Sequence, residues 1–382
     1  MSIFKVPAQI IHGEGQLKAL AKLEGKRASI VTGGNSMKRH GFLDQAVGFL
    51  KSGGMEVQVI DGVEPDPTIE TCVNGGRAMN EFGPDWIIAL GGGSALDASK
   101  VMWVYYEYPD YDFNKLVNFK FPQLRTKAKL ACVPSTSGTA SEITAFAVVT
   151  DPVAQTKYPL VSPQIVPDIA IIDPTLPATM PALITAQTGM DVMAHATEAF
   201  VSTAADDYTD ALAIQAIRLV SSYLERAVKH PNDMEARTKM HNASTLAGMA
   251  FSNCSLGIVH SMAHKIGGRF HLTHGEANAI FMPYVIDYNR KATEKYARLE
   301  GLLGIDDVAQ MVRDLNERVG LTNDIASGVN TKIDEAVFLE ALDEMGELAL
   351  ADGCTLTNPR KPTTEELKQI YKAAYYGAKV DF

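Results

Sequence analysis

Short apolar runs alternate with amphipathic stretches through about the first 180 residues of the chain. The runs contain four to six residues and end at glycine, proline or aspartate. Helical patterns lie between several of them, including residues 43–50 and 69–82. Buried strands separated by helices are typical of a parallel sheet with crossover helices. The sequence therefore predicts an α/β fold for this part, with strands at residues 28–32, 55–60, 86–90, 130–133 and 169–172.

The pattern changes to helical periodicity after about Pro181. Apolar residues three or four apart from Leu212 to Val228 predict one long amphipathic helix. Further helices are expected over residues 306–319, 334–351 and 365–376, and we expect Gly353 to stop the second of these. We therefore predict two domains, an α/β domain over residues 1–181 and an all-helical domain over residues 182–382.

Composition narrows the class of protein. The 382 residues include 35 basic and 45 acidic side chains, a net charge of −10, and no basic block. A protein held to nucleic acid by phosphate contacts is expected to carry the opposite balance. No stretch approaches the 18 apolar residues of a membrane span, and no leader pattern opens the chain. Four dispersed cysteines are typical of free thiols in a reducing compartment, so we expect a cytoplasmic protein.

Three loops rich in glycine and small hydroxyl residues follow predicted strands. Residues 91–94 join a strand to a helical stretch, which is the arrangement that brings backbone amides and a helix N-terminus to a phosphate. A tight turn without a ligand explains this loop alone equally well. Together, three such loops at one sheet edge can surround a dinucleotide. The candidate cofactor-binding residues are Gly33, Gly34, Asn35, Ser36, Gly92, Gly93, Ser94, Ser135, Thr136 and Thr139.

The nine histidines are unevenly placed. Asp191 and His195 are four residues apart in a helical stretch, as are His260 and His264, and His274 follows shortly after. A lone histidine on an apolar face is usually a core residue, but a cluster with an aspartate indicates a metal site. One carboxylate with imidazoles suits iron, zinc, nickel or manganese. The sequence lacks the cysteine spacing of a structural zinc site.

Four motifs carry a resemblance to a known family. They are Gly-Gly-Gly-Ser-Ala-Leu-Asp-Ala-Ser-Lys (91–100), Pro-Ser-Thr-Ser-Gly-Thr-Ala-Ser-Glu (134–142), Gly-Met-Asp-Val-Met-Ala-His-Ala-Thr-Glu (189–198) and His-Ser-Met-Ala-His (260–264), the last followed by His274 and Gly275. Over essentially its whole length the chain resembles the iron-containing (group III) alcohol dehydrogenases. Residues 102–107 and 354–360 are similar to NADP-dependent butanol dehydrogenases and to the alcohol dehydrogenase half of bifunctional aldehyde–alcohol dehydrogenases.

The resemblance implies a dehydroquinate synthase-like fold, with an α/β nucleotide domain followed by a helical metal-binding domain. It implies the metal ligands Asp191, His195, His260 and His274. His264 is then expected near the nicotinamide as a proton relay. Phe251 and Cys354 match pocket-lining positions, although core packing explains them equally well. Asp97, Lys157 and Leu176 complete the expected cofactor-binding set.

The implied reaction is hydride transfer between NAD(P)(H) and a small primary alcohol or aldehyde of the ethanol, butanol or propanediol class. The metal is expected to be Fe²⁺, or zinc, nickel or manganese in its place, and it acts on the substrate oxygen as a Lewis acid. A homodimer or larger homo-oligomer is expected. Two alternatives stay open: a zinc-type, glycerol dehydrogenase-like polyol oxidoreductase, and an inactive or scaffold member of the family.

The loop after the first predicted strand bears on the choice of dinucleotide. NAD-specific members of the family tend to place an aspartate there, which binds the ribose hydroxyl and repels a 2′-phosphate. This chain has Gly33 instead, followed by Lys38 and Arg39. These two cations can receive a phosphate, or they can simply point to solvent. We expect NADP(H) to be favoured over NAD(H).

Overall fold

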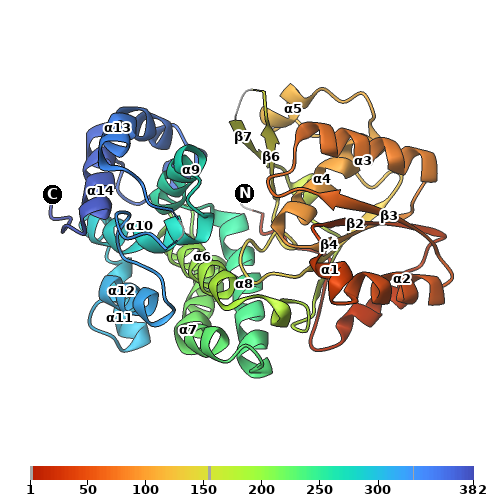
Figure 1. Ribbon diagram of the computed structural model, residues 1–382, viewed down its shortest axis with the longest axis horizontal. Helices are drawn as coiled ribbons and strands as arrows, with labels where there is room; N and C mark the ends of the chain where they lie inside the picture. Colours follow the sequence, from red (N-terminus) through yellow and green to blue (C-terminus); the bar gives the residue numbers. More distant parts are fainter. Residues whose placement is uncertain (1–2, 154–155, 330) are drawn as a thin grey trace. The chain divides into compact units, whose positions relative to one another are not determined.

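The computed structural model describes residues 3–153, 156–329 and 331–382 of the chain (Figure 1). The chain divides into two compact units, Met1–Thr179 and Met180–Phe382. The division falls close to the boundary expected after residue 181. No helix among the described residues has the length and apolar character needed to cross a membrane.

The first unit is built on a six-stranded sheet in which every pair of neighbouring strands is parallel. The strand order is β1-β8-β5-β4-β2-β3. The five strands expected from the sequence are all present: β8 has the expected bounds, and the other four are slightly longer or shifted at their ends. The six strands are β1 (Gln9–His12), β2 (Arg27–Gly33), β3 (Glu56–Val63), β4 (Trp86–Gly91), β5 (Lys129–Pro134) and β8 (Ile169–Ile172).

Helices cover both faces of this sheet, which explains its apolar central strands. Along β4, Ile87 and Ala89 belong to one buried cluster and Ile88 and Leu90 to another, because alternate side chains point to opposite faces. The first cluster includes residues of α3 and α4, and the second includes residues of η1 and α2. The helices of this unit are η1 (Gln16–Lys22), α1 (Ser36–Arg39), α2 (Phe42–Ser52), α3 (Ile69–Phe82), α4 (Gly93–Glu107), α5 (Phe113–Val117), η2 (Pro163–Ile165) and η3 (Pro177–Thr179).

Three strands of the first unit were not expected. β1 is a four-residue strand at the edge of the sheet, and none of its residues is fully buried. β6 (Phe146–Asp151) and β7 (Thr156–Val161) form a separate antiparallel pair. Both strands mix polar and apolar residues, and β7 contains Pro159. A half-exposed strand buries too little apolar surface to leave a strong pattern in the sequence.

The described residues of the second unit form helices and no strand, as expected. Helix α6 is buried along most of its length and contacts α7, α8 and α10. Gly353 does not stop α13, which ends at Leu350; Gly353 instead begins a 3-10 turn whose Cys354 amide is capped by Asp352. The helices are α6 (Ala182–Val201), α7 (Asp207–Lys229), α8 (Met234–Cys254), α9 (Ile258–Phe270), α10 (His274–Asn289), α11 (Lys295–Leu303), α12 (Val308–Arg318), α13 (Glu335–Leu350), η4 (Gly353–Thr357) and α14 (Thr364–Tyr376).

The carboxylate of Glu107, at the end of α4, ties the following loop to that helix. It accepts hydrogen bonds from Trp103 Nε1 at 2.9 Å, from the Arg125 amide at 2.9 Å and from Thr126 Oγ1 at 2.7 Å. Burial opposes ionisation of Glu107, but the hydrogen bonds from Thr126 and Trp103 outweigh burial and lower its pKa.

We expect Glu107→Gln to lower the free energy of unfolding of the first unit by about 1–3 kcal/mol near neutral pH, since an amide cannot accept all these bonds. A carboxylate with a lowered pKa stabilises the fold above its unfolded pKa, and that contribution is lost as the pH falls through the folded pKa. The difference between the variant and the wild type should therefore shrink in acid. Urea unfolding followed by tryptophan fluorescence tests this, because both tryptophans, Trp86 and Trp103, lie in this unit. If the free energies of unfolding of the variant and the wild type differ equally near neutral pH and in acid, this expectation is wrong.

Candidate metal centre and nucleotide loops

Three helices of the second unit bring one carboxylate and three imidazoles together. Asp191 and His195 lie one turn apart on α6, His260 lies in the first turn of α9, and His274 opens α10. One ligand atom from each of the four lies within 4.8 Å of the others. Residues far apart in the sequence therefore converge on one point, as a metal site requires.

Asp191 is at the centre of the group. Its Oδ1 lies 3.6 Å from His260 Nε2 and 3.4 Å from His274 Nε2, and its Oδ2 lies 3.8 Å from His195 Nδ1. The rings of His195 and His260 are stacked with their centres 4.5 Å apart. Asp191, His195 and His260 are buried, whereas the His274 side chain is 43% exposed. One side of the group is thus open to a small ligand.

Asp191 and His195 have the charges that metal ligands need, whereas His260 must lose a proton before it can bind. Burial raises the pKa of Asp191, but the neighbouring imidazoles outweigh burial and hold the pKa well below its usual value. Burial lowers the pKa of His195 to about 3, so this imidazole is neutral. Burial opposes protonation of His260, but Glu198 and Asp191 raise its pKa to about 9. A metal that binds His260 Nε2 therefore displaces a proton.

The donor set fits a divalent transition metal. One carboxylate and three imidazoles suit iron, zinc, nickel or manganese. His195 Nδ1 is buried and finds no hydrogen-bond partner among the described residues, which is expected of an atom that binds a metal. The amide nitrogen of Asn278 lies 2.8 Å from Asp191 Oδ1, 3.2 Å from His260 Nε2 and 3.1 Å from His274 Nε2. The Asn278 NH₂ group thus lies beside one potential ligand atom of each of these three residues.

The other expected residues of the second unit lie beside this group. The Phe251 ring is stacked on His195 with ring centres 4.3 Å apart. His264 lies one turn after His260 on α9, and its ring stacks on His274 at 5.5 Å. Cys354 forms a second group of ligand atoms with His264 and Asp352.

The sequence interpretation missed three residues of the site: Glu198, Asn278 and Asp352. Glu198 follows Asp191 by seven residues and His195 by three, so all three share one face of α6. Asn278 lies one turn after His274 on α10. This helical spacing was a usable signal for both. Asp352 lies in a turn 88 residues from its partner His264, and no local pattern in the sequence points to it.

The glycine loops lie at the carboxyl ends of three neighbouring strands, β2, β4 and β5. The chain runs from β2 outward to β3 and then returns to β4 on the other side of β2. Such a reversal of strand order is where open α/β sheets bind ligands. The loops after β2 and β4 therefore flank the position expected for a dinucleotide.

Close packing explains the glycines in these loops. A Cβ on Gly93 would come within 2.8 Å of the Thr139 side chain, and one on Gly33 within 2.5 Å of the Val63 carbonyl oxygen. The Ser135 amide also donates to the Gly91 carbonyl at 2.8 Å. The loop after β4 thus packs against the loop after β5. Gly93 and Thr139, two of the expected cofactor-binding residues, therefore lie next to each other.

Three further expected cofactor residues have partners within the first unit or lie in its core. Asp97 accepts from Ser141 Oγ at 2.6 Å and from the Val148 amide at 3.0 Å, so both of its oxygens hold α4 to neighbouring segments. Lys157 pairs with Asp66 at 2.7 Å. Leu176 is fully buried. Their roles toward a dinucleotide stay predictions.

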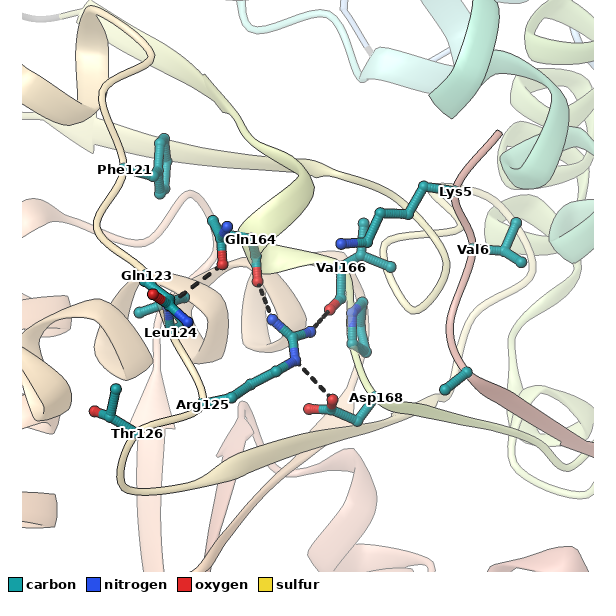
Figure 2. A pocket seen from close by; sticks show the side chains of 12 residues that line it. Lys5, Val6, Phe121, Gln123, Leu124, Arg125, Thr126, Gln164, Val166 and Asp168 are labelled. Carbon is teal, nitrogen blue, oxygen red and sulfur yellow. Dashed lines mark hydrogen bonds and ion pairs between the residues drawn. The ribbon is translucent and has the colours of Figure 1, made fainter. Parts of the chain in front are cut away.

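A pocket of about 700 Å³ in the first unit lies at the opposite edge of the sheet (Figure 2). It includes Arg125 and Asp168, which precede β5 and β8. Arg125 pairs with Asp168 at 2.7 Å and donates to the carbonyl oxygens of Gln164 and Val166 at 2.8 and 2.6 Å. Because parallel sheets bind ligands at the carboxyl ends of their strands, this pocket is not the nucleotide site. The Arg125 guanidinium group joins the segment before β5 to the segment before β8.

A parallel sheet with glycine loops, joined to a helical unit with a carboxylate–imidazole centre, is the arrangement of metal-dependent enzymes of the dehydroquinate synthase-like fold. Comparison with known families identifies it further. Residues 7–174 match the model of the iron-containing alcohol dehydrogenases, and residues 185–375 match the C-terminal model of the same family. The chain belongs to the iron-containing alcohol dehydrogenase family. It is an alcohol dehydrogenase, and in the reverse direction an aldehyde reductase, that uses iron and a nicotinamide dinucleotide.

Individual relatives agree with this assignment. The chain is 46% identical to an NADPH-dependent butanol dehydrogenase of Clostridium saccharobutylicum over the whole of both chains. It is 43% identical over 99% of its length to an aldehyde-alcohol dehydrogenase of Streptococcus pneumoniae, of which it spans 46%. Among solved structures, an iron-containing alcohol dehydrogenase of Thermococcus thioreducens is 37% identical, with a TM-score of 0.91 over 98% of this chain and 100% of that one.

Removal of Asp191 tests the metal centre. Asp191→Ala deletes the carboxylate that faces all three imidazoles, so we expect metal affinity to fall by at least about 100-fold. Metal analysis of protein loaded with Fe²⁺ under anaerobic conditions measures this. Asp210→Ala is a matched control on α7, because Asp210 binds Lys295 and lies outside the group. An Asp191→Ala variant that retains its full complement of iron would refute the centre.

Proposed function

We propose that the chain interconverts small primary alcohols and aldehydes, of the ethanol, butanol or propanediol class, with NADP(H) as the preferred hydride carrier. Asp191, His195, His260 and His274 are its iron ligands. The observation that supports this most strongly is the convergence of these four side chains from three helices within 4.8 Å. A divalent metal held there supplies a Lewis acid for the substrate oxygen, and the dinucleotide accepts or donates the hydride.

The residues beside the metal centre suit a small apolar substrate. Phe251 covers one face of His195 and keeps water from that side of the centre. Burial raises the pKa of the Cys354 thiol well above its usual value, so Cys354 presents a small neutral surface. A short alkyl chain can pack against these two side chains, whereas a polyol would leave hydroxyl groups without partners there.

His264 is suited to carry the proton that alcohol oxidation releases. Its Nδ1 lies 3.1 Å from Asp352 Oδ2, and its side chain is 37% exposed. In the neutral ring, Asp352 holds the Nδ1–H tautomer and leaves Nε2 as the proton acceptor. Because the ring is partly exposed, it can pass the proton on to solvent.

We expect His264→Ala to slow turnover by about 100-fold or more, the usual contribution of a positioned acid–base group. Its iron content should stay at the wild-type level, because His264 is not among the four proposed ligands. Steady-state rates and metal analysis of the same preparation measure both quantities. His230→Ala, which changes an exposed histidine at the end of α7, is the control and should leave both unchanged. Loss of iron from His264→Ala would make His264 a ligand and reject its role as a relay.

The preference for NADP(H) rests on the loop after β2. It carries Gly33 where an acid would repel a 2′-phosphate, and Lys38 and Arg39 are exposed on the short helix that follows. The NADPH dependence of the butanol dehydrogenase relative points the same way. An aspartate at position 33 is also excluded by packing, because its Cβ would lie 2.5 Å from the Val63 carbonyl oxygen.

We expect kcat/KM to be higher with NADPH than with NADH. The double variant Lys38→Ala/Arg39→Ala should raise KM for NADPH at least about fivefold, the equivalent of about 1 kcal/mol, since it removes exposed cations from the phosphate. KM for NADH, which has no 2′-phosphate, should change little and serves as the internal control. A strong preference of the wild type for NADH would refute the interpretation of this loop.

The chain is further proposed to work as a homodimer or larger homo-oligomer in the cytoplasm. Within the described part of the chain, all four cysteines are free thiols, which suits a reducing compartment. Analytical ultracentrifugation tests the oligomeric state, and a monomer at micromolar concentration would contradict it.

A further inference from the structure

Glu198 is a buried carboxylate that contacts one of the proposed metal ligands. It lies on α6, on the same face as Asp191 and His195, and is 3% exposed. Its Oε2 lies 2.5 Å from Nδ1 of His260. The opposite nitrogen of that ring, Nε2, lies 3.6 Å from Asp191 Oδ1. One imidazole thus connects a carboxylate outside the ligand group with the centre of the group.

The second oxygen of Glu198 fixes the carboxylate in place. Oε1 accepts a hydrogen bond of 2.7 Å from the amide of Val259, in the first turn of α9. That amide has no partner within its own helix, and the positive end of the helix dipole favours an anion at this point. Gly257 makes the close approach possible, because a Cβ there would lie 2.8 Å from Glu198 Oε1.

This arrangement determines which nitrogen of His260 can bind a metal. The carboxylate can only accept a hydrogen bond, so Nδ1 must carry the proton. Nε2 then keeps its lone pair, and this lone pair faces Asp191. A carboxylate behind a metal-binding imidazole orients the ring and makes it a stronger ligand.

We infer that Glu198 is a positioning residue of the metal centre, which holds His260 in the Nδ1–H tautomer with Nε2 directed at the metal. Its negative charge also joins that of Asp191, so that two buried carboxylates balance a divalent cation. The inference deepens the proposed function and rests on its ligand set.

Glu198→Gln separates this role from simple packing, since the two side chains have the same shape. The Val259 amide needs an acceptor, so the glutamine oxygen should face it and the NH₂ group should face His260 Nδ1. Nδ1 must then accept, and the proton moves to Nε2, where it blocks the metal. Glu198→Asp keeps the charge on a shorter side chain and should restore part of the metal affinity.

The experiment is a Co²⁺ titration of the full chain after removal of metal, with visible absorption and chelator competition giving Kd. We expect Glu198→Gln to raise Kd by about 10–100-fold. The midpoint of thermal unfolding of the metal-free variant should stay close to that of the metal-free wild type, because the amide oxygen still caps α9. Glu107→Gln is the matched control: it also removes a buried carboxylate and destabilises the fold, but it should leave Kd for Co²⁺ unchanged.

The outcomes are distinguishable. A folded Glu198→Gln variant with the wild-type Kd overturns the inference, and so does an equal loss of affinity in Glu107→Gln. Wild-type protein that binds no Co²⁺ overturns the proposed ligand set itself. If Glu198→Gln does not fold, histidine ¹⁵N resonances of the Zn²⁺-loaded wild type decide the matter. A proton on His260 Nδ1 supports the inference, and metal on Nδ1 overturns it.

Discussion

A buried aspartate constrains the second unit more than any other single residue. Asp191 is 3% exposed and lies in the middle of a helix that is itself buried, where an isolated charge is very costly. Three imidazoles from three helices surround it and hold its pKa well below the usual value. The packing of α6 against its neighbours and the chemistry of the site therefore depend on the same interaction.

The first unit meets a different constraint. Its sheet is covered on both faces, so the only polar surface it can offer a ligand near the backbone is at the ends of the strands. The strand order reverses between β2 and β4. The loops after these two strands carry glycines that lie too close to neighbouring atoms for a larger residue to fit. Phosphate binding then requires only backbone amides and a helix N-terminus, which these loops already provide.

Much of this could be predicted from the sequence. The β4 strand and the helices α3 and α14 follow from local periodicity. Spacing indicates a cluster of histidines with Asp191, and the choice of four ligands within it is what the family resemblance implies. The exposed edge strand β1 and the β6–β7 pair could not be foreseen, because a strand that buries few side chains leaves a weak pattern. Asp352 could not be foreseen either, because its partnership with His264 is made only by tertiary packing. Gly353 gave a false stop signal, since the capping of the next turn by Asp352 determines the local structure.

We propose that one metal bound in the carboxylate–imidazole centre makes the chain an active alcohol dehydrogenase. The most direct test is to reconstitute metal-free protein with Fe²⁺ under anaerobic conditions and follow NADPH oxidation with butyraldehyde. We expect no activity without metal, and a linear rise in activity that levels off at one Fe²⁺ per chain. Full activity of the metal-free protein, or activity that levels off at a ratio other than one Fe²⁺ per chain, would contradict this proposal.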